Sequence, residues 1–345
     1  MNILIVHPGA LGDVLLSRVA MRKLRRAFPK NTLVWVGNSA IGELLMNAKE
    51  VDCTFPIEGR FLSDLYCDAD QWSPETRKVL KSCSHVVCWF ANLDNAIRSR
   101  LTAFGLHAVI IQSPFANQLV SRHFEDRYLE TLLEWNLESP TMPYGGLRVS
   151  QPKHEKERLG ESKCSQAESI RRIAVHPGSG SPHKCTSSST LAAIISRLSQ
   201  EENTALTILE GPVDEQTVSQ LCSLLPDRTY NVEREQSLTT IAQSLPDYDL
   251  FIGHDSGLTH LAVACDVRTI SLFGPTDPEQ WAGRGQHVTV VQGEPCQCKD
   301  WSDVQRCPQR SCLNVSVERV LEHATRLLSL PRIVELRSSL TDNLS

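Results

Sequence analysis

The chain has 345 residues, of which 41% are hydrophobic and 22% are charged, and its formal net charge is −5. These proportions are typical of a globular protein and exclude a disordered or fibrous chain. The length predicts two domains, each large enough to bury its own core. Because a general nucleic-acid binder carries an excess of basic residues, the acidic balance argues against a nucleic-acid partner.

Neither a targeting signal nor a membrane span is expected. The N-terminal residues show no basic region followed by a long apolar stretch, as a secretory signal would. No apolar run approaches the ~18 residues that cross a bilayer. The chain has 12 cysteines, but most stand singly in apolar stretches, as Cys53, Cys88 and Cys265 do, where a thiol behaves as a small hydrophobic group. We therefore expect a protein of the reducing cytoplasm.

The first half of the chain alternates strand-like and helix-like segments. Strands are predicted at residues 2–6, 32–37, 53–57, 86–90 and 108–112. Helices are predicted at residues 14–27, 39–46 and 122–135, with Ser39 as the N-cap of the second helix. Short continuous apolar runs of this kind are typical of a parallel sheet that helices cover on both faces.

Residues 150–169 are rich in Lys, Glu, Ser and Gln and form the best linker candidate. After them, strands are predicted at residues 173–175, 205–210, 249–253 and 269–273, and helices at residues 189–199, 214–224, 238–245, 257–264 and 316–328. The alternation indicates βαβ units with right-handed crossovers. We predict an α/β fold of two Rossmann-like domains, residues 1–160 and 161–330, followed by a C-terminal tail, residues 331–345.

The tetrapeptide Val-His-Pro-Gly occurs twice, at residues 6–9 and 175–178. Each copy closes an apolar stretch and precedes a small-residue loop, so both predict a strand, a turn and a helix N-terminus that offers backbone N–H groups to an anion. A chance match of four residues is the alternative. Ligands bind at the carboxyl ends of the strands in open α/β folds, so two such domains would present both loops to a shared cleft.

The first of these loops, from His7 to Asp13, holds a candidate base. Gly9 and Gly12 permit a tight turn, and Asp13 falls where the helix begins. Two roles are open for this carboxylate. It either caps the helix, which is worth about 1 kcal/mol, or takes a proton from an incoming hydroxyl group.

The second loop, from His176 to Lys184, contains the ingredients of a phosphate site. Ser179 and Gly180 lie in it, and Lys184 ends it with a positive charge. Backbone N–H groups, serine hydroxyls and a lysine together suit a phosphate group. The spacing of a Walker loop is absent, and an ordinary solvated turn is the alternative.

The third segment, residues 251–262, has the highest density of polar groups. A predicted strand ends at Gly253, and the residues of interest follow it: Asp255, Ser256, Gly257, Thr259 and His260. The N–H groups of a helix N-terminus and the positive end of the helix dipole suit a diphosphate. Capping of the helix by Asp255 or Ser256 is the alternative. Another strand-end turn follows at residues 273–278.

Together, residues 7–13, 176–184, 255–262 and 273–278 resemble the motifs of glycosyltransferase family 9. These enzymes are the heptosyltransferases that build the inner core of bacterial lipopolysaccharide, with relatives that use other sugars. The resemblance covers nearly the whole chain, from Asn2 to Leu328. It implies a GT-B fold, two Rossmann-like domains facing across a cleft, with the acceptor bound by the N-terminal domain and the nucleotide-sugar by the C-terminal domain. It also implies inversion at the anomeric carbon without a catalytic metal.

The resemblance implies roles for individual residues. Asp13 matches the general base, beside the acceptor-side glycines Gly9 and Gly12, and Lys184 matches the basic residue on the donor phosphates. The implied donor-binding residues are Ser179, Gly180, Glu210, Asp214, Asp255, Ser256, Gly257, Thr259 and His260. Of these, Glu210 and Asp214 are looser matches, which the resemblance places near the nucleoside. After Lys184 the chain reads Cys-Thr-Ser, where the family commonly has a tryptophan-bearing segment, so the donor pocket departs from the pattern there.

The implied reaction needs the departing phosphate charge to be stabilised, either by a metal or by fixed dipoles and cations. The carboxylates Asp68 and Asp70 lie in a predicted polar loop and not at a strand end. Helix N-termini and Lys184 are the remaining candidates. We therefore expect no cofactor and no catalytic metal.

The expected function is transfer of a sugar, heptose from ADP-heptose, to a lipopolysaccharide-core or related saccharide acceptor. A lipid-linked acceptor would bring the protein to the inner face of the membrane as a peripheral contact. A different nucleotide-sugar donor is one alternative. A non-catalytic nucleotide-sugar-binding relative is another, against which the joint presence of Asp13 and Lys184 argues. A two-domain epimerase of similar fold would need further carboxylates.

Four cysteines gather near the C-terminal end: Cys296, Cys298, Cys307 and Cys312. Four thiols in a short loop are a candidate zinc site. Their C-x-C…C-x4-C spacing is not that of a standard zinc knuckle. Metal binding and an incidental cluster of thiols are therefore both open at this point.

Overall fold

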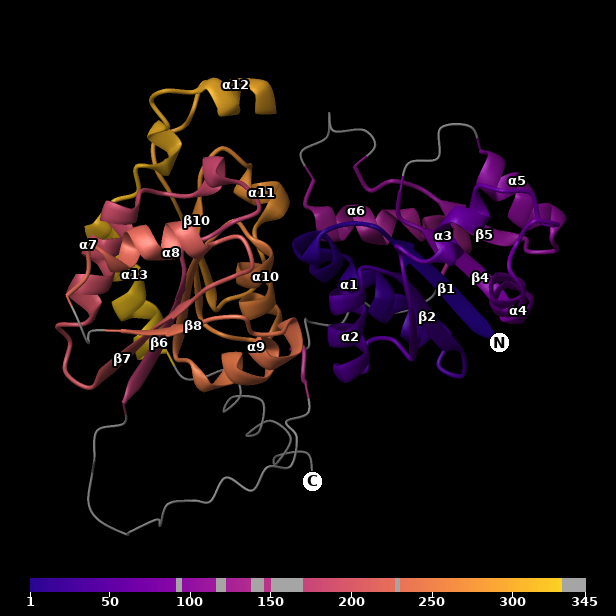
Figure 1. The fold of residues 1–345 in the computed structure, drawn as a ribbon, viewed down its shortest axis with the longest axis horizontal. Coiled ribbons are helices and arrows are strands. Elements are labelled where there is room, and N and C mark those ends of the chain that lie inside the picture. The colour runs from indigo at the N-terminus through magenta and orange to yellow at the C-terminus, as the bar shows by residue number, and fades with distance from the viewer. Residues whose placement is uncertain (91–94, 116–121, 138–145, 150–169, 227–229, 331–345) are drawn as a thin grey trace, which may run out of the picture. The chain divides into compact units, whose positions relative to one another are not determined.

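The computed structural model describes residues 1–345 except for 91–94, 116–121, 138–145, 150–169, 227–229 and 331–345 (Figure 1). The chain divides into two compact units, unit 1 from Met1 to Gly145 and unit 2 from Gly146 to Ser345. The predicted linker, the predicted boundary after residue 160 and the predicted tail lie outside the described residues. Among the helices that are described, none combines the length and hydrophobicity that crossing a bilayer requires.

Unit 1 is built on a five-stranded parallel sheet in the order β3-β2-β1-β4-β5. Its strands are β1 (Asn2–His7), β2 (Thr32–Gly37), β3 (Cys53–Pro56), β4 (Cys83–Cys88) and β5 (Ala108–Ile111). Its helices are α1 (Leu11–Ala27), α2 (Ser39–Asn47), α3 (Arg60–Leu65), α4 (Pro74–Ser82), α5 (Ala96–Ala103), α6 (Phe124–Thr131) and the 3-10 turn η1 (Leu133–Trp135). Side chains of α3, α4 and α5 join one core cluster with the sheet, and α1 packs against α6.

Unit 2 is built on a six-stranded parallel sheet in the order β11-β10-β9-β6-β7-β8. Its strands are β6 (Arg171–His176), β7 (Thr204–Leu209), β8 (Asn231–Glu233), β9 (Leu250–His254), β10 (Thr269–Phe273) and β11 (Val288–Gln292). Its α-helices are α7 (Ser188–Leu198), α8 (Glu215–Cys222), α9 (Leu238–Ser244), α10 (Gly257–Ala264), α11 (Pro278–Trp281), α12 (Trp301–Arg306) and α13 (Val317–Ser329). Three 3-10 turns accompany them: η2 (Pro182–Lys184), η3 (Leu245–Asp247) and η4 (Ser311–Leu313). Figure 1 shows α7 and α13 on one side of the sheet and α10 on the other.

The five strands of the unit 1 sheet follow the same order as the first five strands of unit 2, which confirms the predicted repeat of an α/β unit. In unit 1 the chain builds β1, β2 and β3 outward and then returns to place β4 beside β1. In unit 2 it builds β6, β7 and β8 outward and returns to place β9 beside β6. Ligands of open α/β sheets bind at this reversal, at the carboxyl ends of the strands. Both Val-His-Pro-Gly segments lie there, because His7 ends β1 and His176 ends β6.

The sequence patterns misplace several helix starts. The helix predicted at residues 14–27 begins three residues earlier, because α1 starts at Leu11. The N-cap of α2 is Asn38 and not Ser39, because the Asn38 side chain accepts hydrogen bonds from the N–H groups of Ala40 and Ile41. The predicted helix over residues 122–135 is shorter, since His123 caps α6 and a separate 3-10 turn follows it.

Several short elements are absent from the sequence predictions: α3, α4, α5, α11, α12, β8 and β11. Most of them span too few residues for a clear hydrophobic period. A start signal was present for α4, where Ser73 caps the helix and Pro74 occupies its first turn.

Candidate active site

In unit 2, polar side chains gather where the neighbouring strands β6 and β9 end. The two strands pair in parallel, with His176 opposite Gly253, so the segments that leave them start side by side. The segment after β6 carries Lys184 on η2 before α7 begins. The segment after β9 leads through Asp255 directly into α10. This arrangement places a lysine and an aspartate at the reversal of the strand order.

Asp255 is the centre of this group. Its buried carboxylate accepts hydrogen bonds from Lys184 Nζ at 2.7 Å and from Thr276 Oγ1 at 2.7 Å. His260 Nε2 lies 3.9 Å from the other carboxylate oxygen. Burial acts to raise the pKa of Asp255, but the nearby His260 imidazole and the Lys184 charge outweigh burial and hold that pKa well below its usual range. Asp255 is therefore ionised, and it holds the Lys184 ammonium group at the strand end.

The start of α10 is fixed by hydroxyl groups. Ser256 is the N-cap, and its Oγ accepts the Thr259 N–H at 3.4 Å. Thr259 Oγ1 donates to the His254 carbonyl at 2.6 Å. Gly253 leaves room for this contact, since a Cβ there would lie 2.6 Å from Thr259 Oγ1. The positive end of the α10 dipole, which begins at Gly257, is thereby held at the end of β9, where it favours an anion.

A second buried network lies beside the first. Asp214 Oδ2 lies 2.9 Å from His176 Nε2 and accepts the Gly211 N–H at 3.0 Å. The other ring nitrogen of His176 lies 3.3 Å from Ser256 Oγ. Burial acts to raise the pKa of Asp214, but the hydrogen bond with His176 outweighs burial, and the net shift is downward. A Cβ at residue 178 would lie 1.9 Å from Asp214 Oδ1, so this close approach requires Gly178.

Of the remaining predicted donor-binding residues, Ser179 contacts Asp255, whereas Gly180 and Glu210 do not. Ser179 Oγ donates to the Asp255 carbonyl at 2.7 Å and so joins the two loops. A Cβ on Gly180 would face open space in the described chain. Glu210 follows β7 and forms an ion pair with Arg234 at 3.0 Å, apart from the contacts of Asp255.

Sequence reasoning gave no role to three side chains of this region. His176 links Asp214 to Ser256, and Thr276 shares the Asp255 carboxylate with Lys184. His254 Nε2 accepts the Thr186 N–H at 3.0 Å, and burial lowers the pKa of His254 to about 4, so its imidazole is neutral. The repeated histidine of Val-His-Pro-Gly and the turn at residues 273–278 were the available signals for the first two.

In unit 1, the loop after β1 places Asp13 in the first turn of α1. Asp13 is the third residue of the helix, and its Oδ2 accepts the N–H of Ala10 at 3.1 Å. Ala10 is the cap residue, so Asp13 is not the N-cap but supports the same turn from inside the helix. A Cβ at residue 9 would lie 3.0 Å from Asp13 Cβ, so Gly9 keeps the loop tight. Gly12 lies between them in the first turn.

His7, the last residue of β1, contacts the loop that leads to Asp13. His7 Nδ1 accepts the Gly9 N–H at 3.0 Å, and its Nε2 lies 2.9 Å from the hydroxyl oxygen of Tyr128 on α6. Burial lowers the pKa of His7 to about 3. The imidazole is therefore neutral, and with Nδ1 accepting, its Nε2–H donates to Tyr128.

The hydroxyl group of Tyr128 interacts electrostatically with the carboxylate of Asp13. Burial raises the pKa of the Tyr128 hydroxyl, and the negative charge of Asp13 raises it further. The rings of Trp35 and Trp89 each lie 5.7 Å from the His7 ring, centroid to centroid. The rings of Trp35, Trp89 and Tyr128 thus pack around the neutral His7 imidazole, next to the turn that carries Asp13.

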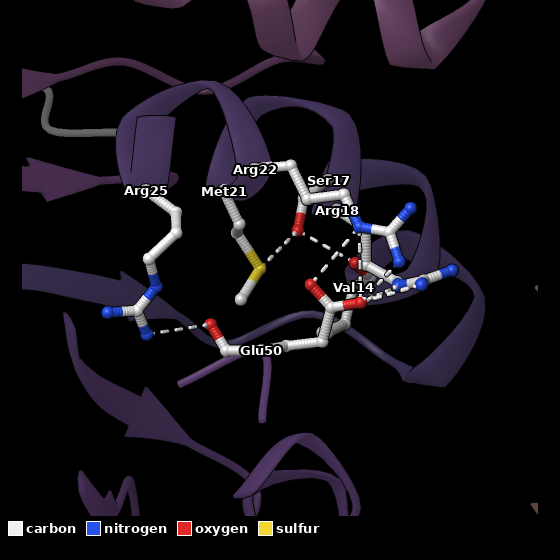
Figure 2. A network of polar contacts seen from close by, with 7 residues as sticks. All are labelled: Val14, Ser17, Arg18, Met21, Arg22, Arg25 and Glu50. Atoms are coloured by element: carbon white, nitrogen blue, oxygen red, sulfur yellow. Dashed lines mark hydrogen bonds and ion pairs between the residues drawn. The ribbon is translucent and has the colours of Figure 1, made fainter. Parts of the chain in front are cut away.

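Helix α1 is anchored by a buried ion network (Figure 2). Glu50 Oε1 accepts hydrogen bonds from Arg18 Nη2 at 2.6 Å and from Arg22 Nη2 at 2.7 Å. Arg25 Nη2 lies 3.5 Å from the Glu50 carbonyl oxygen. Burial acts to raise the pKa of Glu50, but the two guanidinium groups outweigh burial and lower it. The network ties α1, and with it the turn of Asp13, to the chain that follows α2.

We expect the substitution Glu50→Ala to lower the free energy of unfolding by about 3–5 kcal/mol, because Arg18 would stay buried without this carboxylate. Since the folded-state pKa of Glu50 is lowered, the stabilisation is complete above the unfolded-state pKa and is lost as the pH falls through the folded-state pKa. Urea titration followed by tryptophan fluorescence measures the change. The control is exposed Glu58→Ala, expected within about 0.5 kcal/mol of the wild type. Equal losses in both variants would contradict the assignment.

Comparison with known proteins identifies relatives of the chain. A family model described as glycosyltransferase family 9 (heptosyltransferase) matches residues 107–308, more than half of the chain. Lipooligosaccharide heptosyltransferase 2 of Campylobacter jejuni subsp. jejuni is 26% identical over 129 residues. That match covers 34% of this chain and 39% of the relative, so it spans well under two thirds of the relative's length.

Two solved structures share the fold over nearly the whole chain. A glycosyl transferase of family 9 from Veillonella parvula has a TM-score of 0.74 at 18% identity, covering 95% of this chain and 97% of that one. E. coli heptosyltransferase WaaC with ADP-2-deoxy-2-fluoro heptose has a TM-score of 0.63 at 18% identity, covering 94% and 99%. These similarities and the two parallel sheets confirm the predicted two-domain GT-B class. The chain belongs to glycosyltransferase family 9 (heptosyltransferase).

Proposed function

We propose that this chain is an inverting, metal-independent glycosyltransferase that moves heptose from ADP-heptose to a lipopolysaccharide-core or related saccharide acceptor. The observation that carries the proposal is the group of Lys184, Asp255 and Thr276 at the positive end of α10, in a member of family 9. We place the reaction in the cytoplasm, with peripheral contact at the membrane where the acceptor is lipid-linked.

Unit 2 has the features that a nucleoside diphosphate requires. Lys184 supplies a positive charge and α10 supplies the positive end of a dipole, while Ser179 and Thr276 hold Asp255, the partner of Lys184, by hydrogen bonds. The Lys184 charge and the α10 dipole together offset the charge that develops on a departing diphosphate. WaaC, which shares the fold, has been solved with ADP-2-deoxy-2-fluoro heptose, and this supports an ADP-heptose donor.

Unit 1 has a carboxylate suited to the acceptor side of the reaction. We assign Asp13 the removal of the proton from the acceptor hydroxyl as its oxygen forms a bond to the anomeric carbon. The bond from that carbon to the diphosphate oxygen breaks, and the nucleoside diphosphate leaves with the electron pair. Attack on the face opposite the leaving group inverts the anomeric configuration. No step needs a metal, because Lys184 and the helix dipole stabilise the leaving group.

Thermal shift against ADP, UDP, GDP and CMP tests the donor. A ligand that binds only the folded state raises the midpoint of unfolding by mass action, and we expect ADP to raise it most. Heptose transfer from ADP-heptose to a core acceptor lacking heptose then tests the reaction. A larger shift with UDP or GDP would point to a different donor, and nucleotide binding without any transfer would favour a non-catalytic relative.

The same transfer assay tests metal independence. Activity is expected to survive EDTA and to gain nothing from added Mg²⁺ or Mn²⁺, because the charges on the leaving group are met by side chains and dipoles. An absolute requirement for either of these two ions would contradict the metal-free step.

A further inference from the structure

Residues 293–314, here called the cysteine segment, extend from the body of unit 2. The segment has little hydrophobic core of its own. The buried side chains within this segment are Val304, Cys312 and Leu313. The Gly293 N–H donates to the Cys312 carbonyl at 3.0 Å, so the two ends of the segment meet. Figure 1 shows α12, the helix of this segment, at one end of unit 2 and clear of the helices that cover its sheet. A small closed segment with so few buried groups gains stability from a cross-link or a metal.

Three thiols converge in the cysteine segment. The Sγ atoms of Cys296, Cys298 and Cys307 lie within 4.8 Å of one another. The separation is 2.8 Å between Cys296 and Cys298 and 3.9 Å between Cys296 and Cys307. Two sulfurs bound at about 2.3 Å to one tetrahedral ion lie about 3.8 Å apart. The second separation matches this value, and a shift of about 1 Å in Cys298 brings the first to it.

A fourth thiol completes the set. Cys312 is buried at the end of the cysteine segment that meets Gly293, and its side chain contacts Cys296. A backbone N–H, that of Arg310, points at Cys307 Sγ at 3.4 Å. Hydrogen bonds of this kind from outside the ligand set support thiolates in metal sites. Arg310 makes the contact from a left-handed conformation, with φ 44°, which a non-glycine residue keeps only where its surroundings fix it.

We propose that Cys296, Cys298, Cys307 and Cys312 bind one thiolate-preferring transition-metal ion, zinc or iron, which holds the cysteine segment in place. Four sulfur ligands in a tetrahedral arrangement select these metals over Mg²⁺ and Ca²⁺, which prefer oxygen. On binding, each thiol releases its proton to solvent and its sulfur donates an electron pair to the metal, with no change of oxidation state.

The metal would brace the donor side of unit 2 without taking part in the chemistry. The Trp301 ring of the cysteine segment lies 6.0 Å from Lys184 Nζ, measured to the ring centroid. The Leu313 carbonyl of the same segment accepts a hydrogen bond from Thr186 Oγ1 at 2.7 Å. Both contacts fall on the turn that carries Lys184. A metal that fixes the segment therefore also fixes two neighbours of this turn.

The first test is the metal content of the full chain, purified without chelator from cells grown with both zinc and iron. We expect about one equivalent of one metal per chain by mass spectrometry of the elements. Iron bound to thiolates absorbs visible light and zinc does not, so the spectrum separates the two. Cys298→Ser and Cys307→Ser, at partly exposed positions, should abolish the metal. Cys222→Ser, a half-buried thiol on α8, is the matched control and should retain it.

The second test uses reduced, metal-free wild-type protein. Titration with Co²⁺ should produce the visible absorption of a tetrahedral thiolate complex, and Cys298→Ser should lose it. Trypsin should cut after Lys299, Arg306 or Arg310 about tenfold faster without metal, because the cysteine segment opens locally. Purified protein that holds no metal and does not bind Co²⁺ overturns the proposal, as does a complete Cys296–Cys298 disulfide. No readout uses a nucleotide or a sugar, so failure here is distinct from failure of the proposed function.

Discussion

Asp13→Asn is expected to lower turnover about 10²–10⁴-fold while leaving ADP binding unchanged, because the variant loses its basic oxygen but keeps its shape. An asparagine oxygen can still accept the Ala10 N–H that Asp13 accepts at 3.1 Å, so the first turn of α1 is preserved. The substitution therefore separates proton removal from support of the turn. Single-turnover transfer and ADP titration measure the two effects.

The matched comparison is Asp13→Ala, which removes both roles. It should show the same loss of turnover and, in addition, a lower unfolding midpoint, since the contact to the cap residue is worth about 1 kcal/mol. Near-normal turnover in Asp13→Asn together with a stability loss in Asp13→Ala would leave Asp13 with a structural role alone. Unchanged tryptophan fluorescence in both variants verifies the fold, because four of the six tryptophans lie in unit 1.

Lys184→Ala is expected to weaken ADP binding about 10–100-fold and to slow transfer about 10²–10³-fold. The variant loses a charge-assisted contact to the diphosphate and leaves the ionised Asp255 facing it, because Lys184 is the cation at 2.7 Å from that carboxylate. Calorimetric ADP titration and the transfer assay measure the changes. Arg319→Ala, which removes one exposed positive charge from α13 in the same unit, is the control and should leave both unchanged.

A double substitution distinguishes lost attraction from gained repulsion. If the bare Asp255 carboxylate repels the diphosphate, Lys184→Ala combined with Asp255→Asn should bind ADP more tightly than Lys184→Ala alone. Strictly additive losses would mean that Asp255 acts on the donor independently of Lys184. ADP affinity equal to the wild type in Lys184→Ala would remove Lys184 from the donor site.

The strand ends that carry the candidate site were predictable from the sequence. Apolar runs that stop at His7, His176 and Gly253 are followed by small and polar residues, so each turn had one place to form. The resemblance to family 9 then singled out Asp13 and Lys184 from the other polar residues of these turns.

The contacts between these segments were not predictable. Tyr128 meets His7 across 121 positions of sequence, and Asp214 meets His176 across 38. A single sequence records neither the packing that joins distant segments nor the direction of a side chain. The tryptophan that the family pattern places after Lys184 shows the same limit, since here the aromatic ring beside Lys184 is that of Trp301 on α12. The predicted cleft between the domains stays a prediction.

The ion pair with Asp255 immobilises the Lys184 side chain before any donor binds. A lysine that is bound at 2.7 Å to a buried carboxylate has already lost the rotamer freedom of its long side chain during folding. A donor that arrives at this preorganised ammonium group does not lose affinity by immobilising it, a cost of about 0.5–1.5 kcal/mol for a rotamer-rich side chain. The Asp255 carboxylate stays beside the Lys184 ammonium group after transfer. It competes with the diphosphate for hydrogen bonds from that ammonium group. Preorganisation of this kind therefore favours both rapid capture of the donor and release of the spent nucleotide.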